Sequence, residues 1–304
     1  MSVSSVAAQI SKEDLDGPGR DQVTQTARSL MSNLIFMPSV EDLAMTGEKN
    51  PDIAIELGTT LARFAWHANL PEDQLAIAKQ QLHWAQQLDP PDPLILAKTH
   101  GYVAMAESNR GQHEKALESY ATKKRILAGI EDPEARRAEW YVLNNSSASL
   151  EKLGQLEAAE AGYRECLSIA RSREDDQGMV DWSHRNLGRV LLAQGRNEAA
   201  YEEISQCNTI TILLDRSDFI LQMNQFYLEE AQIYLDAARR TGRTAEELAV
   251  SEVLCDFRGK SPELISTPYF DSICERTREL RETLGMPPET RPAGESDDDS
   301  DPES

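Results

Sequence analysis

The side chains that most often perform chemistry are present in this sequence, but their spacing matches no reactive arrangement. Acidic pairs such as Glu202-Glu203 are frequent, yet adjacent side chains on a helix point about 100° apart and do not converge on one substrate. No phosphate-binding glycine loop, nucleophilic serine motif or zinc-protease motif occurs. The five histidines are scattered and lack the spacing of metal ligands; they are His67, His83, His100, His113 and His184. The sequence therefore predicts no enzyme, no catalytic residue, no metal site and no cofactor.

The four cysteines are Cys166, Cys207, Cys255 and Cys274, and none belongs to a C-x-x-C pair. Because no secretory signal is recognisable, we expect reduced, buried thiols in a cytoplasmic or nuclear protein. A cysteine at such a position acts as a small buried hydrophobe. The alternative is a set of reactive sensor thiols, which would need cationic neighbours.

The chain is strongly acidic, with a formal net charge of -21. Such a chain is repelled by phosphate backbones and anionic lipid surfaces, so we expect no nucleic acid and no membrane as partner. No apolar run approaches the 18 residues or so of a membrane-spanning helix. The charge favours basic protein partners, or it belongs only to a solvated helical surface. Nothing in the sequence indicates a small-molecule substrate.

A repeated pattern of small and large residues organises the middle of the chain. Each copy has Gly, then Ala five residues later, then a large apolar residue nine residues after the Gly, and the copies are offset by 43 and 41 residues. The Gly permits the left-handed backbone between two helices, the Ala lets them approach, and the large residue fills the space one turn further on. Gly188 is a small residue on the preceding helix that faces the third Ala. The copies contain Gly111, Ala116 and Tyr120, then Gly154, Ala159 and Tyr163, then Gly195, Ala200 and Ile204.

Composition and helix breakers divide the chain into five parts. Residues 1–20 are a flexible lead, residues 21–51 a helix and connector, and residues 52–257 the repeat array. Residues 258–286 are a capping helix region, and residues 287–304 an acidic tail that is disordered by composition. Less regular copies flank the three regular ones, and extra residues around His67–Gln74 interrupt the first. We expect an all-α solenoid of about five helix pairs with terminal capping helices.

The array resembles the tetratricopeptide repeat family over residues 52–257. Its period exceeds the usual length of about 34 residues and is similar to that of the long-helix variety in kinesin light chains and spindle-orientation adaptors. Leu143-Asn144-Asn145 and Arg185-Asn186-Leu187-Gly188 resemble the start of those repeats. The resemblance implies a right-handed superhelix whose first helices line a concave groove for a peptide or a partner's helix. It also implies that Asn145 and Asn186 hydrogen-bond the backbone of an extended peptide.

An amide side chain suits that role because it donates and accepts hydrogen bonds, as a peptide backbone does. The alternative is that Asn145 and Asn186 satisfy only neighbouring helices or water. His184 and His100, which lie near the same part of their repeats, are further peptide-binding candidates. For each of them the alternative is an ordinary surface histidine.

Protein binding is the leading functional hypothesis, in the form of a scaffold or adaptor that holds a peptide or helix in the concave groove. The alternative is a regulatory or sensor subunit whose solenoid gates an NTPase or a transcription factor in another chain. A linear peptide that binds alone would favour the adaptor. A second chain bound through the convex surface would favour the regulator.

Overall fold

All regular secondary structure in the computed structural model is helical over the described residues, which are 47–48, 51–173, 176–214, 225–260 and 268–287. The expected lead and first helix before residue 47 and the acidic tail after residue 287 lie outside these ranges. The helices are α5 (Pro51–His67), α6 (Pro71–Ala85), α7 (Pro93–Asn109), α8 (His113–Leu127), α9 (Pro133–Lys152), α10 (Leu156–Arg171), α11 (Gln177–Ala193), α12 (Asn197–Ile204), α13 (Asn208–Leu214), α14 (Gln225–Arg240), α15 (Thr244–Lys260) and α16 (Pro268–Thr283).

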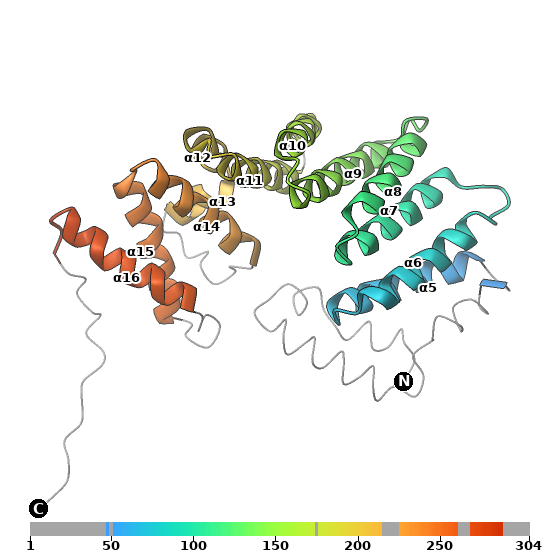
Figure 1. Cartoon of the computed structure of the whole chain (residues 1–304), viewed down its shortest axis with the longest axis horizontal. Coiled ribbons are helices and arrows are strands. Elements are labelled where there is room, and N and C mark those ends of the chain that lie inside the picture. The colour runs from blue at the N-terminus through green and yellow to red at the C-terminus, as the bar shows by residue number, and fades with distance from the viewer. Residues whose placement is uncertain (1–46, 49–50, 174–175, 215–224, 261–267, 288–304) are drawn as a thin grey trace, which may run out of the picture.

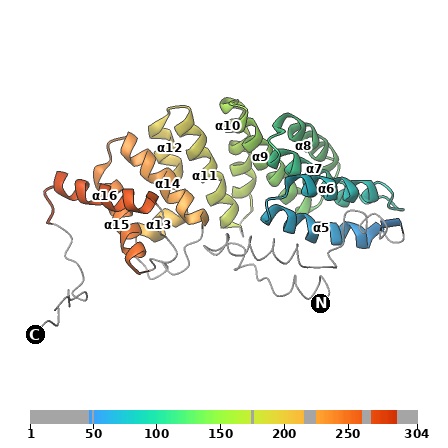
Figure 2. The same cartoon turned by 60° about the horizontal axis from the view of Figure 1, so that its bottom comes forward.

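The helices succeed one another as packed pairs. α5 packs on α6, α7 on α8, α9 on α10, α11 on α12, and α14 on α15, while α16 packs on α15. Each pair also contacts the next, which is the nearest-neighbour arrangement of a solenoid. The array curves into an arch, with α10 and α12 on its outer side and α9, α11 and α14 further in (Figures 1 and 2). The prediction of an all-α solenoid of about five helix pairs is confirmed.

One residue with a left-handed backbone separates the two helices of every pair. In four pairs it is a glycine, and φ is 73° at Gly111, 75° at Gly154, 76° at Gly195 and 72° at Gly242. In the first pair it is Asn69, with φ of 54°, and asparagine is one of the few other residues that adopt this conformation. The expectation of extra residues around His67–Gln74 was therefore wrong, because this segment is the ordinary turn between α5 and α6 with Asn in place of Gly.

Aspartates determine where three of the first helices begin. Asp92, Asp132 and Asp176 precede α7, α9 and α11, and each carboxylate accepts a hydrogen bond from a backbone N–H of the first turn. Such caps satisfy N–H groups that have no partner within the helix. The chain therefore starts each of these helices at a defined residue, which fixes the register of the side chains that they present.

Small residues let the helices of each pair approach. Ala116, Ala159 and Ala200 are fully buried, as the repeat spacing requires. At Gly188 a Cβ atom would lie 3.2 Å from Cβ of Ile204 and 3.4 Å from Cγ2 of Ile233, so α11 packs closely against both α12 and α14. The largest cluster of buried side chains runs from α10 to α16, and further clusters fill the space between the earlier helices.

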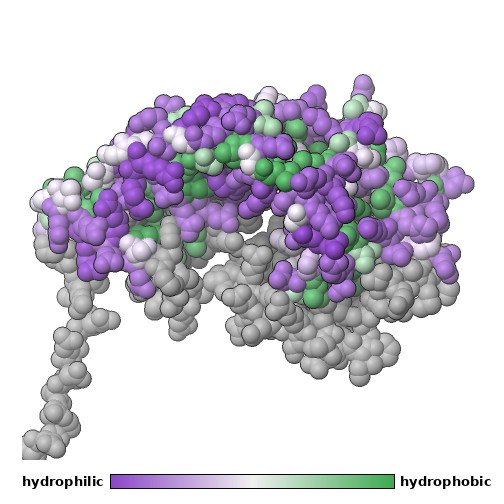
Figure 3. Space-filling model, in the orientation of Figure 1, coloured by the Kyte–Doolittle hydropathy of each residue, from purple (hydrophilic) through white to green (hydrophobic). Residues whose placement is uncertain are grey.

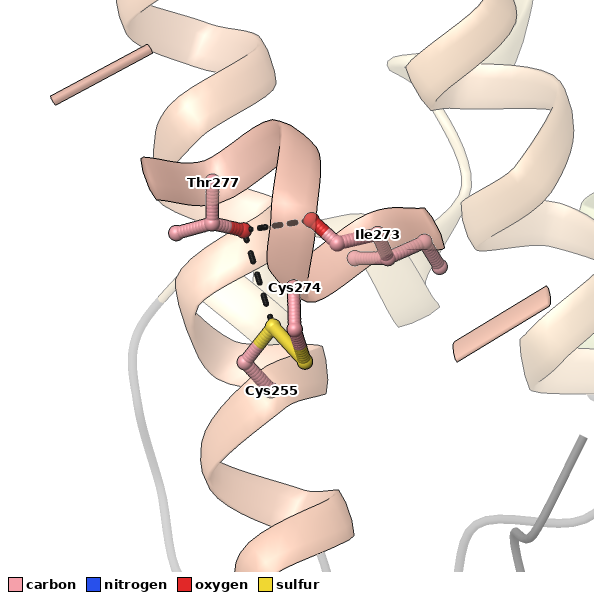
Figure 4. The surroundings of a disulfide bond; sticks show 4 residues. All are labelled: Cys255, Ile273, Cys274 and Thr277. Atoms are coloured by element: carbon pink, nitrogen blue, oxygen red, sulfur yellow. Dashed lines mark hydrogen bonds between the residues drawn. A yellow bond between two sulfur atoms is a disulfide. The ribbon is translucent and has the colours of Figure 1, made fainter. Parts of the chain in front are cut away.

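The cysteines correct one expectation. Cys255 on α15 and Cys274 on α16 form a disulfide bond, with their Cα atoms 5.5 Å apart (Figure 4). They are 19 residues apart in sequence, and only the packing of α16 on α15 brings them together, so their spacing gave no sign of the pairing. Cys166 and Cys207 are free and buried. Burial raises the pKa of the Cys166 thiol to about 12, which does not suit a reactive thiol.

Candidate functional site

A pocket of about 480 Å³ lies where α7, α8 and α9 meet. The first helices α7 and α9 form its walls, and residues of α8, the second helix of the α7 pair, form its floor. Figure 3 shows hydrophilic residues over most of one face of the arch, with hydrophobic residues visible between them. We refer to this site as the α7–α9 pocket.

The walls of the α7–α9 pocket carry exposed apolar side chains. Leu94 and Met105 on α7 are 36% and 38% exposed, and Tyr141 on α9 is 40% exposed. Within the described part of the chain, these are three of the six large hydrophobic residues that are exposed. A gathering of such residues in one hollow is unusual on a surface that binds nothing.

Positive charge lines the same pocket. Lys98 from α7, Lys123 from α8 and Arg137 from α9 contribute to the lining, whereas Glu134 is its single acidic residue. Lys123 is half-buried, and burial together with the neighbouring charge of Lys98 lowers its pKa to about 8. The pocket therefore combines apolar walls with a basic floor in a chain whose net charge is -21.

Asn145 lies at the edge of this pocket, on α9. It is half-buried and is hydrogen-bonded to Tyr120 on α8. Its Oδ1 also accepts a hydrogen bond from Nδ2 of Asn144, at 3.0 Å. Of the four peptide-binding candidates, Asn145 is the one that lines the α7–α9 pocket, with its amide held in place by two neighbours.

Asn186 occupies a different environment, although its repeat position matches that of Asn145. It is 3% exposed, and its Nδ2 donates to Oδ1 of Asn144 at 2.7 Å. Asn186, Asn144 and Asn145 therefore form a row of linked amides from α11 to α9. The side chain of Asn186 is a buried connection between two helices, which agrees with the alternative interpretation of this residue rather than with a groove-facing donor.

His184 is also buried, with 3% exposure. Arg171 on α10 donates from Nη2 to Nε2 of His184 at 3.3 Å, because an arginine can only donate. Nδ1 must then carry the proton that is shared with Oε2 of Glu203 on α12, at 2.9 Å, and this bond is the main reason that the pKa of Glu203 is lowered. His184 thus ties α10, α11 and α12 together.

His100 on α7 is half-buried, and burial lowers its pKa. It is not among the residues that line the α7–α9 pocket. The structure therefore does not bring the four sequence candidates into one site. Leu94, Met105, Tyr141 and Lys123 were missed. The repeat offset of 43 residues could have identified one of them. It places Tyr141 at the repeat position of Lys98, and both residues are exposed.

Over residues 47–48, 51–173, 176–214, 225–260 and 268–287, no three His, Cys, Asp or Glu side chains gather in a way that could hold a metal ion. Over the same segments no helix is both long and apolar enough to cross a membrane.

Comparisons with known proteins point to one kind of fold. No family model matches the chain. A segment of 127 residues, 41% of this chain, is 30% identical to "Tetratricopeptide repeat protein 23" of Mus musculus and covers 26% of that protein. The chain therefore spans about a quarter of the length of this curated relative.

Among solved structures, BtubC (BKLC) from P. vanneervenii superposes with a TM-score of 0.51 and 18% identity, over 91% of this chain and 97% of that one. The apo form of RapI superposes with a TM-score of 0.44 and 12% identity, over 87% of this chain and 81% of that one. At such identities the first of these likenesses concerns the fold alone.

Proposed function

We propose that the chain, whose helix pairs and partial sequence match resemble tetratricopeptide repeat proteins, acts as a protein-interaction adaptor. The bound element is a peptide or a helix of a partner, and it lies against the first helices α7 and α9. The α7–α9 pocket is its anchoring point. The adaptor itself performs no chemistry.

The observation that carries this proposal is the exposure of Leu94, Met105 and Tyr141 on the walls of one pocket. Methionine and tyrosine are enriched at protein interfaces, where they provide a large contact area. Such residues bind best when they are anchored in a hollow that excludes water. In this proposal the half-buried amide of Asn145, at the edge of the pocket, forms hydrogen bonds with the backbone of the bound segment.

The test compares two charge-introducing variants of the full chain. Met105→Glu combined with Tyr141→Glu places carboxylates in the pocket. Leu284→Glu is the matched control, because Leu284 is similarly exposed at 43% but lies just after α16, outside the pocket. Proteins captured from the native host by the wild type are identified by mass spectrometry and compared with those captured by each variant, and one of them is then purified and titrated.

We expect the pocket variant to lose a partner that Leu284→Glu retains, with affinity reduced at least about thirtyfold, or roughly 2 kcal/mol, as for a hot-spot residue. Circular dichroism must show both variants folded. Equal binding by a folded pocket variant would contradict the proposal. It would favour the second candidate, a regulatory subunit that contacts its effector through the outer helices.

A further inference from the structure

A lysine of the outer helix reaches the inner pocket through a gap at a glycine. Lys123 lies on α8, the second helix of its pair, yet it lines the α7–α9 pocket, whose walls belong to α7 and α9. A Cβ atom at Gly101 of α7 would lie 2.8 Å from Nζ of Lys123 and 3.1 Å from its Cδ. The amino group therefore occupies the place that a side chain at position 101 would take.

The neighbours of that amino group on α7 follow from helical spacing. Lys98 lies three residues before Gly101 and Met105 lies four residues after it, so both are on the face of α7 that carries the gap. Met105, together with Tyr141 from α9, supplies exposed apolar surface to the lining. The nitrogen of Lys123 thus has a cation on one side and an apolar wall on the other.

The chain does not match the charge of Lys123. Within the described residues Lys123 makes no ion pair and no hydrogen bond, and the charge that acts on it is the like charge of Lys98. Because partial burial and a like charge both disfavour the ammonium form, the pKa of Lys123 falls to about 8. At pH 7 about a tenth of Lys123 is then uncharged, against about one part in 2,500 for an ordinary lysine. An uncharged amine has the free electron pair that a nucleophile needs.

The remaining groups of the pocket do not restore that charge. Glu134 is the single acidic residue of the lining, and Arg137 lies 4.0 Å from Asp176, outside the pocket. Besides Lys98, the titratable and charged groups that line the pocket with Lys123 are Tyr102 on α7, Tyr120 on α8, and Glu134, Arg137 and Tyr141 on α9. The next residue, Lys124, differs in each respect, since it is exposed and pairs with Glu165 at 3.4 Å.

We propose that Lys123 is a site of covalent acylation, and that the acyl donor is a thioester whose apolar chain lies against Met105 and Tyr141. Nζ of the uncharged lysine attacks the carbonyl carbon of the thioester, and the C–S bond breaks. The thiolate that leaves takes up the proton that the nitrogen loses, so the products are an amide and a free thiol, and nothing is oxidised or reduced. The reaction modifies the chain once and is not a turnover.

The pocket favours both the reaction and its product. Negative charge develops on the carbonyl oxygen during the attack, and the ammonium group of Lys98 places a positive charge on the same side of the pocket. The amide that forms is uncharged, so one of two neighbouring like charges is removed. The acyl chain in turn covers apolar surface that is otherwise exposed to water.

The experiment treats the full chain with hexanoyl and acetyl thioesters of the same small thiol, and peptide mass spectrometry follows the initial rate at each lysine. Lys124 is the matched control. At pH 7 we expect Lys123 to be acylated at least about fivefold faster than Lys124, because of its larger uncharged fraction. At Lys123 the hexanoyl donor should react at least about tenfold faster than the acetyl donor, since each buried methylene group favours binding about fourfold. At Lys124 the two donors should react alike.

The dependence on pH gives a second readout. The rate at Lys123 in the folded chain should rise up to about pH 8 and then level off, because the amine is uncharged above its pKa. In urea the pocket is absent, so the rate at Lys123 should keep rising to about pH 10 and its advantage over Lys124 should disappear.

Three variants separate charge, position and apolar contact. Lys98→Gln removes the like charge, so acylation at pH 7 should slow severalfold and the plateau should move to higher pH. Gly101→Ala displaces the end of Lys123 and should also slow acylation severalfold. Met105→Ser should reduce the preference for the hexanoyl donor while acetylation proceeds at the wild-type rate. A melting curve for each variant confirms that it is folded.

Three outcomes would overturn the proposal in whole or in part. Equal rates at Lys123 and Lys124 in the folded chain would show that Lys123 is not a preferred acylation site. A preference for Lys123 that persists in urea would place its cause in the local sequence and not in the pocket. Equal rates with hexanoyl and acetyl donors would remove the apolar chain from the proposal. The acylation does not rest on the adaptor function, because the modified lysine is measured without a partner.

Discussion

Two pockets of nearly equal size lie along the first helices of this array. The α7–α9 pocket measures about 480 Å³, and a second one of about 490 Å³ lies between α11 and α14. We call the latter the α11–α14 pocket. Its cations have partners within the chain: Arg189 donates from Nε and Nη2 to Glu151, at 2.9 Å each, and Arg240 lies 3.7 Å from Asp236. In the α7–α9 pocket Arg137 lies 4.0 Å from Asp176, whereas Lys98 and Lys123 make no ion pair within the described residues.

The difference shows that volume alone does not identify a binding site in a solenoid. The α11–α14 pocket is a hollow between two first helices whose cations are matched by carboxylates of the same chain. A hollow in which the chain leaves both a buried charge and its apolar walls unmatched is the better candidate.

The largest effect is expected where the α11–α14 pocket loses its internal anion. Glu151→Gln keeps the shape but leaves Arg189 charged without its partner, and it also removes the charged acceptor of the Tyr163 hydroxyl. Unfolding in urea should show a loss of about 2–3 kcal/mol. The control is Glu165→Gln, whose exposed pair with Lys124 should contribute less than about 0.5 kcal/mol. Equal effects of the two changes would contradict the comparison.

In the α7–α9 pocket, by contrast, a substitution that removes a charge is expected to raise the free energy of unfolding. Lys123→Met removes a half-buried charge that has no ion-pair partner within the described residues, so it should raise the free energy of unfolding by about 1 kcal/mol at pH 7. Because the pKa of Lys123 is lowered from 10.5 to about 8 in the folded protein, the unfolded chain binds more protons between those values. The wild type therefore gains stability as pH rises from about 8 to 10.5.

The advantage of Lys123→Met should accordingly be complete below pH 8 and shrink as pH rises above it. Urea unfolding of the wild type and the variant at pH 7 and pH 9.5 measures this difference. A variant less stable than the wild type at pH 7 would mean that Lys123 has a stabilising partner.

The smallest effects are expected at the two asparagines of the repeat motif, where one substitution should lower stability and the other should weaken binding. Asn186→Ala removes the donor to Asn144 inside the array and should cost about 1 kcal/mol of stability. It should change peptide binding little while the protein stays folded. Asn145→Ala should weaken binding by about 0.5–1.5 kcal/mol if its amide contacts the ligand. Melting curves and titrations on the same preparations decide this, and equal binding by both variants would place the ligand away from α9.

Much of the fold could be predicted because its rules are local. Gly111, Gly154 and Gly195 mark turns that need a left-handed backbone, and the alanines five residues later are buried where two helices meet. The first pair was harder, since Asn69 takes the place of the glycine. A pattern that relies on one residue type misses a substitute that satisfies the same backbone requirement.

The site was less predictable because it depends on distances across helices. Asn145 and Asn186 share a repeat position, but the packing of α11 on α9 buries only the second of them. Lys123 reaches the pocket only because Gly101 on another helix leaves room. Neither the burial of Asn186 nor the path of Lys123 past Gly101 follows from a spacing in the sequence. Both depend on how neighbouring helices pack against each other.

The disulfide between Cys255 and Cys274 has a consequence for how the array comes apart. In a linear array each unit is stabilised by its neighbours, so the terminal unit, which has one neighbour, frays first. The bond joins α16 to α15, and α16 therefore cannot leave without disturbing the pair before it. In the oxidised chain the smallest cooperative unit at this end contains both helices, whereas after reduction α16 can fray alone. At the α16 end, the redox state thus sets whether one helix or two separate from the array as a unit.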